Sequence, residues 1–63
     1  DDIRLIASQA ISYLTKDGFL LFEHGYNQGP AVVSILTDLG YRQVQTIKDY
    51  GNNDRVTLGQ APA

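Results

Sequence analysis

The sequence predicts an α/β fold whose elements follow the order helix, strand, helix, strand, strand, and it indicates the end portion of a larger domain. Apolar residues recur with helical spacing in residues 1–15 and again in 30–40. Between them, residues 19–22 (Phe-Leu-Leu-Phe) are apolar at every position, so a strand there would be apolar on both faces. Such a strand is typical of the interior of a parallel sheet, where helices cover both faces.

Residues 1–15 are predicted to form an amphipathic helix. Its apolar residues share one face because they recur at intervals of three and four: Ile3, Ile6, Ala7, Ala10, Ile11 and Leu14. Asp1 and Asp2 suit the N-terminus, where acidic groups interact favourably with the helix dipole. Residues 16–18 (Lys-Asp-Gly) would end the helix, with Gly18 in the left-handed conformation that glycine adopts easily.

A strand is predicted at residues 19–23, and a polar loop with two glycines follows at 24–29. Pro30 suits the first residue of a second helix, since its missing N–H needs no partner there. The stripe that this helix would bury consists of Val32, Ile35, Leu36 and Leu39. Gly40 would end the helix, and Tyr41 would pack back on its last turn.

Residues 43–49 and 55–59 are predicted to form a β-hairpin around the turn residues of 50–54. The polarity of 43–49 suits an edge strand. In the second strand, Val56 and Leu58 would share one face.

Both helices are expected on one face of the sheet, because crossovers between parallel strands are almost always right-handed. The other face would then carry apolar residues without cover, and burying each one stabilises by about 1.5–3 kcal/mol. With 63 residues and no cysteine, the chain cannot use disulfides or thiolate metal sites instead. It also begins at Asp1 and contains no methionine, so we expect that residue 1 follows a cut and that more protein covers the open side.

Charge and hydropathy argue against several functional classes. Five basic residues against seven acidic ones give a net charge of −2, and the basic residues are scattered. Direct nucleic-acid binding is therefore not expected. The sequence contains no stretch of about 18 apolar residues that would span a membrane, and its single histidine cannot form a structural zinc site.

Glu23 and His24 are candidate site residues because they lie at the carboxyl end of the first predicted strand, the edge where open α/β sheets bind ligands. One interpretation makes them outer support for a cofactor or substrate pocket. The alternative, which we favour, is that they cap nearby backbone or that His24 packs in the loop.

Asp49, Asp54 and Arg55 also have two interpretations. They would form a substrate-binding cluster or, as we favour, Asp49 and Arg55 pair across the hairpin. The tyrosines are expected to be half-buried at element ends with their hydroxyls in water: Tyr13, Tyr26, Tyr41 and Tyr50.

The strings Phe-Leu-Leu-Phe-Glu-His-Gly at 19–25 and Asp-Tyr-Gly-Asn-Asn-Asp-Arg-Val-Thr-Leu-Gly at 49–59 resemble the HemK/PrmC family. Residues 28–32 and the pair at 40–41 also resemble that family's last helix. Its members are S-adenosylmethionine-dependent methyltransferases that modify the glutamine of the Gly-Gly-Gln motif in peptide chain release factors.

The resemblance implies that residues 1–63, without an internal boundary, are the C-terminal portion of a class I, Rossmann-like methyltransferase sheet. Its last strand would be antiparallel and inserted between the other two. The family's glycine-rich cofactor loop and Asn-Pro-Pro-Tyr motif are absent from this sequence. No catalytic, cofactor-binding, substrate-binding or metal-ligating residue is therefore carried over, and we expect the chain alone to be inactive.

The resemblance also implies the surroundings of the parent enzyme. It would use S-adenosylmethionine, act on release factors in the cytoplasm and bind neither nucleic acid nor membrane directly. The partner of this chain would be the N-terminal half of the same enzyme. The alternative is an autonomous α/β interaction or dimerisation module, whose apolar sheet face would make the isolated chain self-associate.

Overall fold

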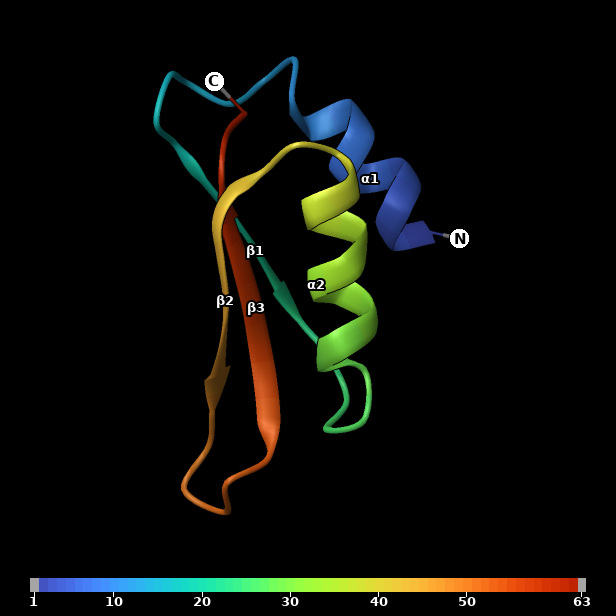
Figure 1. The fold of residues 1–63 in the computed structure, drawn as a ribbon, viewed down its shortest axis with the longest axis vertical. Helices are drawn as coiled ribbons and strands as arrows, with labels where there is room; N and C mark the ends of the chain where they lie inside the picture. The colour runs from blue at the N-terminus through green and yellow to red at the C-terminus, as the bar shows by residue number, and fades with distance from the viewer. Residues whose placement is uncertain (1, 63) are drawn as a thin grey trace.

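The computed structural model describes residues 2–62, and its elements follow the order predicted from the sequence (Figure 1). Two helices, α1 (Asp2–Ala10) and α2 (Gly29–Asp38), lie on the same side of a three-stranded sheet. The strands are β1 (Phe19–Glu23), β2 (Arg42–Lys48) and β3 (Asp54–Gln60). The predicted α/β architecture and the expected placement of both helices on one face are confirmed.

The strand order is β1-β3-β2, and β3 runs antiparallel to both neighbours. β1 and β2 are therefore parallel to each other, and the segment between them contains α2. Leu58 in β3 lies opposite Leu21 in β1 and Gln45 in β2. The pairing of β2 with β3 changes register between Arg42 and Gln45 and again between Ile47 and Lys48. The last strand is thus antiparallel and inserted between the other two, as the resemblance implied. β2 is an edge strand of this sheet, as its polarity predicted.

α1 ends at Ala10 and not at residue 15, so the predicted length of the first helix is wrong. The N–H of Tyr13 donates to the carbonyl of Ala10 at 2.9 Å and closes a turn there. Within the predicted apolar face, Ala7 is fully buried, whereas two other members are exposed, Ile6 and Ile11. Periodicity alone overestimated the length of the helix, because the spacing of apolar residues does not show which of them pack against another element. Asp1 lies outside the described residues.

The left-handed residue after α1 is Asp17, with φ of 66°, and not Gly18 as predicted. Because the helix has already ended, Gly18 is not its C-terminal cap and leads directly into β1. Asp17 is among the residues that tolerate this conformation. Its carboxylate accepts a 2.9 Å hydrogen bond from Arg42, which ties the turn to β2.

The end of α2 follows the prediction. Gly40 has φ of 92° and donates its N–H to the carbonyl of Thr37 at 3.0 Å, while the N–H of Tyr41 donates to Leu36 at 3.0 Å. These two bonds form a Schellman motif, which glycine permits at low steric cost. At the other end, Pro30 is the second residue of the helix and not the first.

The core lies between α2 and the face of the sheet that it covers. Its buried members are Ala7, Val32, Leu36 and Tyr41, with Leu20, Phe22 and Val44 packed against them. Gly59 allows this close approach, because a Cβ atom there would lie 3.1 Å from Cβ of Tyr41. The expectation for Tyr41 is wrong: its side chain is buried, and its hydroxyl donates to the carbonyl of Ala7 at 2.7 Å.

The opposite face of the sheet, which we call the open face, has no helix over it among residues 2–62 (Figure 1). Strand alternation and the register place five apolar residues on it: Phe19, Leu21, Ile47, Val56 and Leu58. Leu21 is 58% exposed and Ile47 is 49% exposed. The predicted lack of cover is therefore confirmed for the described part of the chain.

Candidate functional site

The loop of residues 24–28 follows the carboxyl end of β1 and leads into α2. It is closed by two hydrogen bonds, from the N–H of Gln28 to the carbonyl of Gly25 at 3.0 Å and from the N–H of Gly25 to Oε1 of Gln28 at 2.8 Å. Gln28 is also the N-cap of α2, and its carbonyl accepts a 3.1 Å bond from the N–H of Val32. The loop is therefore fixed to the helix that follows it.

His24 joins this loop to the sheet through both ring nitrogens. Nδ1 lies 2.8 Å from the carbonyl oxygen of Gly25, and Nε2 lies 2.8 Å from the hydroxyl oxygen of Thr57. The Thr57 hydroxyl lies 3.0 Å from that of Thr46. Thr57 has no exposed surface, so these contacts satisfy a hydroxyl that water does not reach. The side chains of His24, Thr57 and Thr46 connect the end of β1 to β3 and β2. We call this series of one imidazole and two hydroxyl groups the hydroxyl row.

Glu23 and His24 are adjacent in sequence but face opposite sides of the sheet. Glu23 lies opposite Val56, on the open face, and is exposed. His24 is half-buried on the side that α2 covers. The structure does not bring the two candidates together, and the interpretation of either as outer support for a pocket stays a prediction.

Asp54 lies at the N-terminus of α2, although the two are far apart in sequence. A Cβ atom on Gly29 would lie 2.5 Å from Oδ2 of Asp54, so the carboxylate packs against the first residue of the helix. Its other oxygen accepts a 2.6 Å hydrogen bond from Lys48. A negative charge at this position is favoured by the helix dipole, and the N-cap Gln28 supplies no side-chain bond of its own.

Sequence reasoning missed this role because it placed Asp54 in the hairpin turn. The turn ends one residue earlier, and Asp54 is the first residue of β3. Nothing local in the sequence connects it to Gly29. The only available signal was Gly29, a glycine before Pro30 at the start of a helix. A glycine there suggests that another group packs closely against the helix, but it does not identify that group.

Asp49 holds the hairpin loop between β2 and β3. Its Oδ1 accepts from the N–H groups of Gly51 at 2.8 Å and Asn53 at 3.0 Å, and its Oδ2 accepts from Nε of Arg55 at 2.8 Å. The Arg55 guanidinium, and then the Asn53 amide, lower the pKa of Asp49 below its ordinary value. The predicted pair of Asp49 and Arg55 is confirmed, while Asp54 pairs with Lys48 instead of joining a cluster with them.

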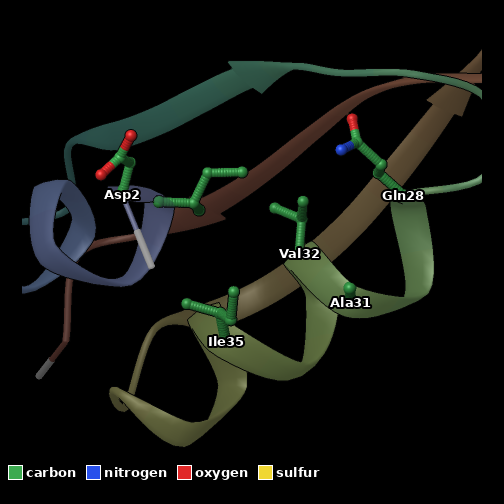
Figure 2. A pocket seen from close by; sticks show the side chains of 6 residues that line it. Asp2, Gln28, Ala31, Val32 and Ile35 are labelled. Atoms are coloured by element: carbon green, nitrogen blue, oxygen red, sulfur yellow. The ribbon is translucent and has the colours of Figure 1, made fainter.

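A cavity of about 320 Å³ lies between α1 and α2 (Figure 2). It is lined by Asp2, Ile3, Gln28, Ala31, Val32 and Ile35. In Figure 2, the carboxylate of Asp2 and the amide of Gln28 lie at opposite ends of a mostly apolar wall. Because Gln28 also closes the loop after β1, that loop forms one end of the cavity.

The described residues contain no cluster of metal-ligating side chains, and the glycines of the loop after β1 and of the first turn of α2 are closely packed. Among them, no three His, Asp or Glu side chains lie together as metal ligands would. The space at Gly25 is filled by the side chain of Gln28, and the space at Gly29 is filled by the carboxylate of Asp54. The loop glycines therefore leave no cradle for a ligand. Neither described helix is long and apolar enough to cross a membrane.

Known proteins similar to this chain match it over almost its whole length. Release factor glutamine methyltransferases from Vibrio cholerae and Yersinia pestis are 58% and 54% identical to it over 59 residues, which is 94% of this chain. The protein of that name from Pseudomonas aeruginosa is 52% identical over 60 residues, or 95% of the chain. No family model matches the chain.

The match is confined to a small part of each relative. It covers 21% of the first two proteins and 22% of the third, so the chain spans about a fifth of the length of these curated relatives. The resemblance carried by residues 19–25 and 49–59 is confirmed, and the chain corresponds to a C-terminal segment of such proteins.

Proposed function

We propose that this C-terminal segment completes the catalytic domain of a protein-(glutamine-N5) methyltransferase, which moves a methyl group from S-adenosylmethionine to the Gly-Gly-Gln glutamine of peptide chain release factors. The observation that carries the proposal is 58% identity over 94% of the chain to a release factor glutamine methyltransferase. The strand order β1-β3-β2 with an antiparallel β3 suits the end of the class I, Rossmann-like sheet that such a protein would have.

In this proposal the role of the segment is structural. The open face and the outer edge of β1 are the surfaces that the upstream half of the enzyme covers. Phe19 and Leu21 are each about half exposed on that face, and burying such a side chain stabilises by about 1.5–3 kcal/mol. Within residues 2–62, β1 pairs with β3 alone, which leaves its other edge to an upstream strand.

The glycine-rich cofactor loop of the family is absent from this sequence, so no described residue is assigned to S-adenosylmethionine. We therefore assign no step of methyl transfer to this chain. Its contribution is part of the wall of the ligand site at the carboxyl end of β1, where the loop of residues 24–28 leads into α2. Open α/β sheets bind their ligands at this edge.

A segment exchange tests the proposal. This chain replaces the matching segment of the Vibrio cholerae relative, and the chimera is incubated with labelled S-adenosylmethionine and a release factor. We expect methylation of the Gly-Gly-Gln glutamine by the chimera, none of a release factor with alanine at that glutamine, and none by the chain alone. A folded chimera without methyl transfer contradicts the proposed function, and transfer by the chain alone contradicts the structural role.

A further inference from the structure

We infer that His24 is a positioning residue, which sets the loop of residues 24–28 by accepting a hydrogen bond from Thr57 and donating one to Gly25. Its effect on methyl transfer rests on the function proposed above. The hydrogen-bond geometry itself does not depend on that function.

The direction of each bond follows from what its atoms can donate or accept. The carbonyl oxygen of Gly25 only accepts, so Nδ1 of His24 carries a proton and donates it. In a neutral imidazole the other nitrogen is then an acceptor, so the Thr57 hydroxyl donates to Nε2. The Thr57 oxygen in turn accepts from the hydroxyl of Thr46. The hydroxyl row therefore runs in one direction, from β2 through β3 to the end of β1.

The carbonyl of Gly25 joins this row to the start of α2. It accepts from Nδ1 of His24 at 2.8 Å and from the N–H of Gln28 at 3.0 Å, which uses both of its lone pairs. Gln28 is the N-cap of α2 and forms one end of the cavity between the helices. A displacement of the imidazole ring is thus transmitted to the N-cap residue of α2.

Thr57 is the fully buried member of the hydroxyl row. The side chain has no exposed surface and lies on the central strand, so its hydroxyl cannot form a hydrogen bond with solvent water. Without that hydroxyl, Nε2 of His24 would lose its donor in a half-buried position. The loop would keep its backbone bonds, but the imidazole ring of His24 would no longer be held by the side chain of Thr57. In the proposed enzyme, a shift of about 1 Å in such a wall lowers the rate by up to about a hundredfold.

The test uses the full-length chimera with four single variants and one double variant. Thr57→Val removes the hydroxyl at nearly constant shape, and Thr57→Ser restores it. His24→Asn keeps a donor near the position of Nδ1 but has no acceptor at that of Nε2. Thr37→Val is the control, because Thr37 is an exposed threonine of α2.

We expect Thr57→Val and His24→Asn each to lower kcat by about tenfold to a hundredfold with the chimera still folded. Thr57→Ser and Thr37→Val should leave kcat near that of the unsubstituted chimera. The double variant His24→Asn/Thr57→Val should be no worse than the poorer single variant, because both changes break the same bond. Nitrogen-15 NMR of the neutral ring should show the Nδ1–H tautomer, which a merely space-filling histidine has no reason to adopt.

An Nε2–H tautomer overturns the inference, and so does an active chimera whose kcat is unchanged by Thr57→Val. Loss of kcat in Thr57→Ser equal to that in Thr57→Val also overturns it, because the hydroxyl would then not be the cause. An inactive unsubstituted chimera contradicts the proposed function instead, and the tautomer then decides the inference by itself.

Discussion

The hydroxyl group of Tyr41 donates a 2.7 Å hydrogen bond to the carbonyl oxygen of Ala7 and so joins the end of α2 to α1. Both residues belong to the core. Tyr41 reaches this position because the Schellman motif at Gly40 turns the chain back over the last turn of α2. One local backbone feature therefore places the side chain that holds the two helices together.

Tyr41→Phe should lower the free energy of unfolding of the chain by about 1–3 kcal/mol, because the buried carbonyl of Ala7 loses its donor. Tyr13→Phe is the control, since Tyr13 is exposed and its change should stay within about 0.5 kcal/mol. Urea denaturation followed by circular dichroism measures both values. Equal stabilities for the two variants would show that the Tyr41 bond contributes nothing.

Burial raises the pKa of Tyr41 above its ordinary value. The unfolded chain loses the hydroxyl proton of Tyr41 near pH 10, while the folded chain keeps it to higher pH. The stabilisation of the folded state by protonated Tyr41 is therefore complete below about pH 10. It is lost as the pH rises through the folded pKa. The stability of the unsubstituted chain should therefore fall more steeply above about pH 10 than that of Tyr41→Phe. Parallel pH profiles for the two proteins would contradict the assignment.

Arg55→Gln should raise the pKa of Asp49 toward its ordinary value, because the Arg55 hydrogen bond is the largest cause of its depression. A lowered carboxyl pKa stabilises the folded state above about pH 3.9, and this contribution is lost as the pH falls through the folded pKa. The variant should thus lose less stability on acidification. NMR titration of the Asp49 carboxyl measures the shift directly, with Arg4→Gln as a control that breaks a different ion pair.

Gly29→Ala should destabilise the chain by about 1–3 kcal/mol, because the new methyl group would overlap the carboxylate of Asp54. Gly25→Ala is the matched control, since its nearest atom is the flexible end of the Gln28 side chain at 3.3 Å. Asp54→Ser should relieve part of the effect of Gly29→Ala. A Gly29→Ala variant as stable as Gly25→Ala would mean that Asp54 does not pack on the helix.

Features set by neighbouring residues were predictable from the sequence. The cap at Gly40 and the pair of Asp49 and Arg55 each depend on a few residues of one segment, so turn chemistry and charge spacing indicated them. The open face was predictable because a strand at residues 19–22 is apolar on both of its faces. The helices of this chain were expected to cover only one of these faces, and the structure leaves the other exposed.

Features set by distant residues were not predictable. His24 was a candidate by its place after a strand, but nothing identified Thr57, because a threonine in a strand is ordinary. Only the register between β1 and β3 brings the two together. The early end of α1 has the same origin, since the neighbours of Ile11 and not its spacing decide whether it is buried.

Leu21→Ser should weaken binding of this chain to an upstream methyltransferase half by about tenfold to a hundredfold, since the lost burial is worth about 1.5–3 kcal/mol. Leu5→Ser is the matched control, because Leu5 is 57% exposed and Leu21 is 58% exposed, but Leu5 lies on α1 and not on the open face. Titration calorimetry gives both affinities. Equal weakening by the two variants would rule out the open face as the docking surface.

Sedimentation velocity of this chain, alone and mixed with the upstream part of the Vibrio cholerae relative, tests the central claim most directly. If the open face is completed by the rest of a methyltransferase, the mixture should contain a one-to-one complex, and it should form at the expense of any self-association. A chain that sediments identically with and without the upstream part would contradict the account. A stable homodimer that ignores the upstream part would favour the autonomous interaction module.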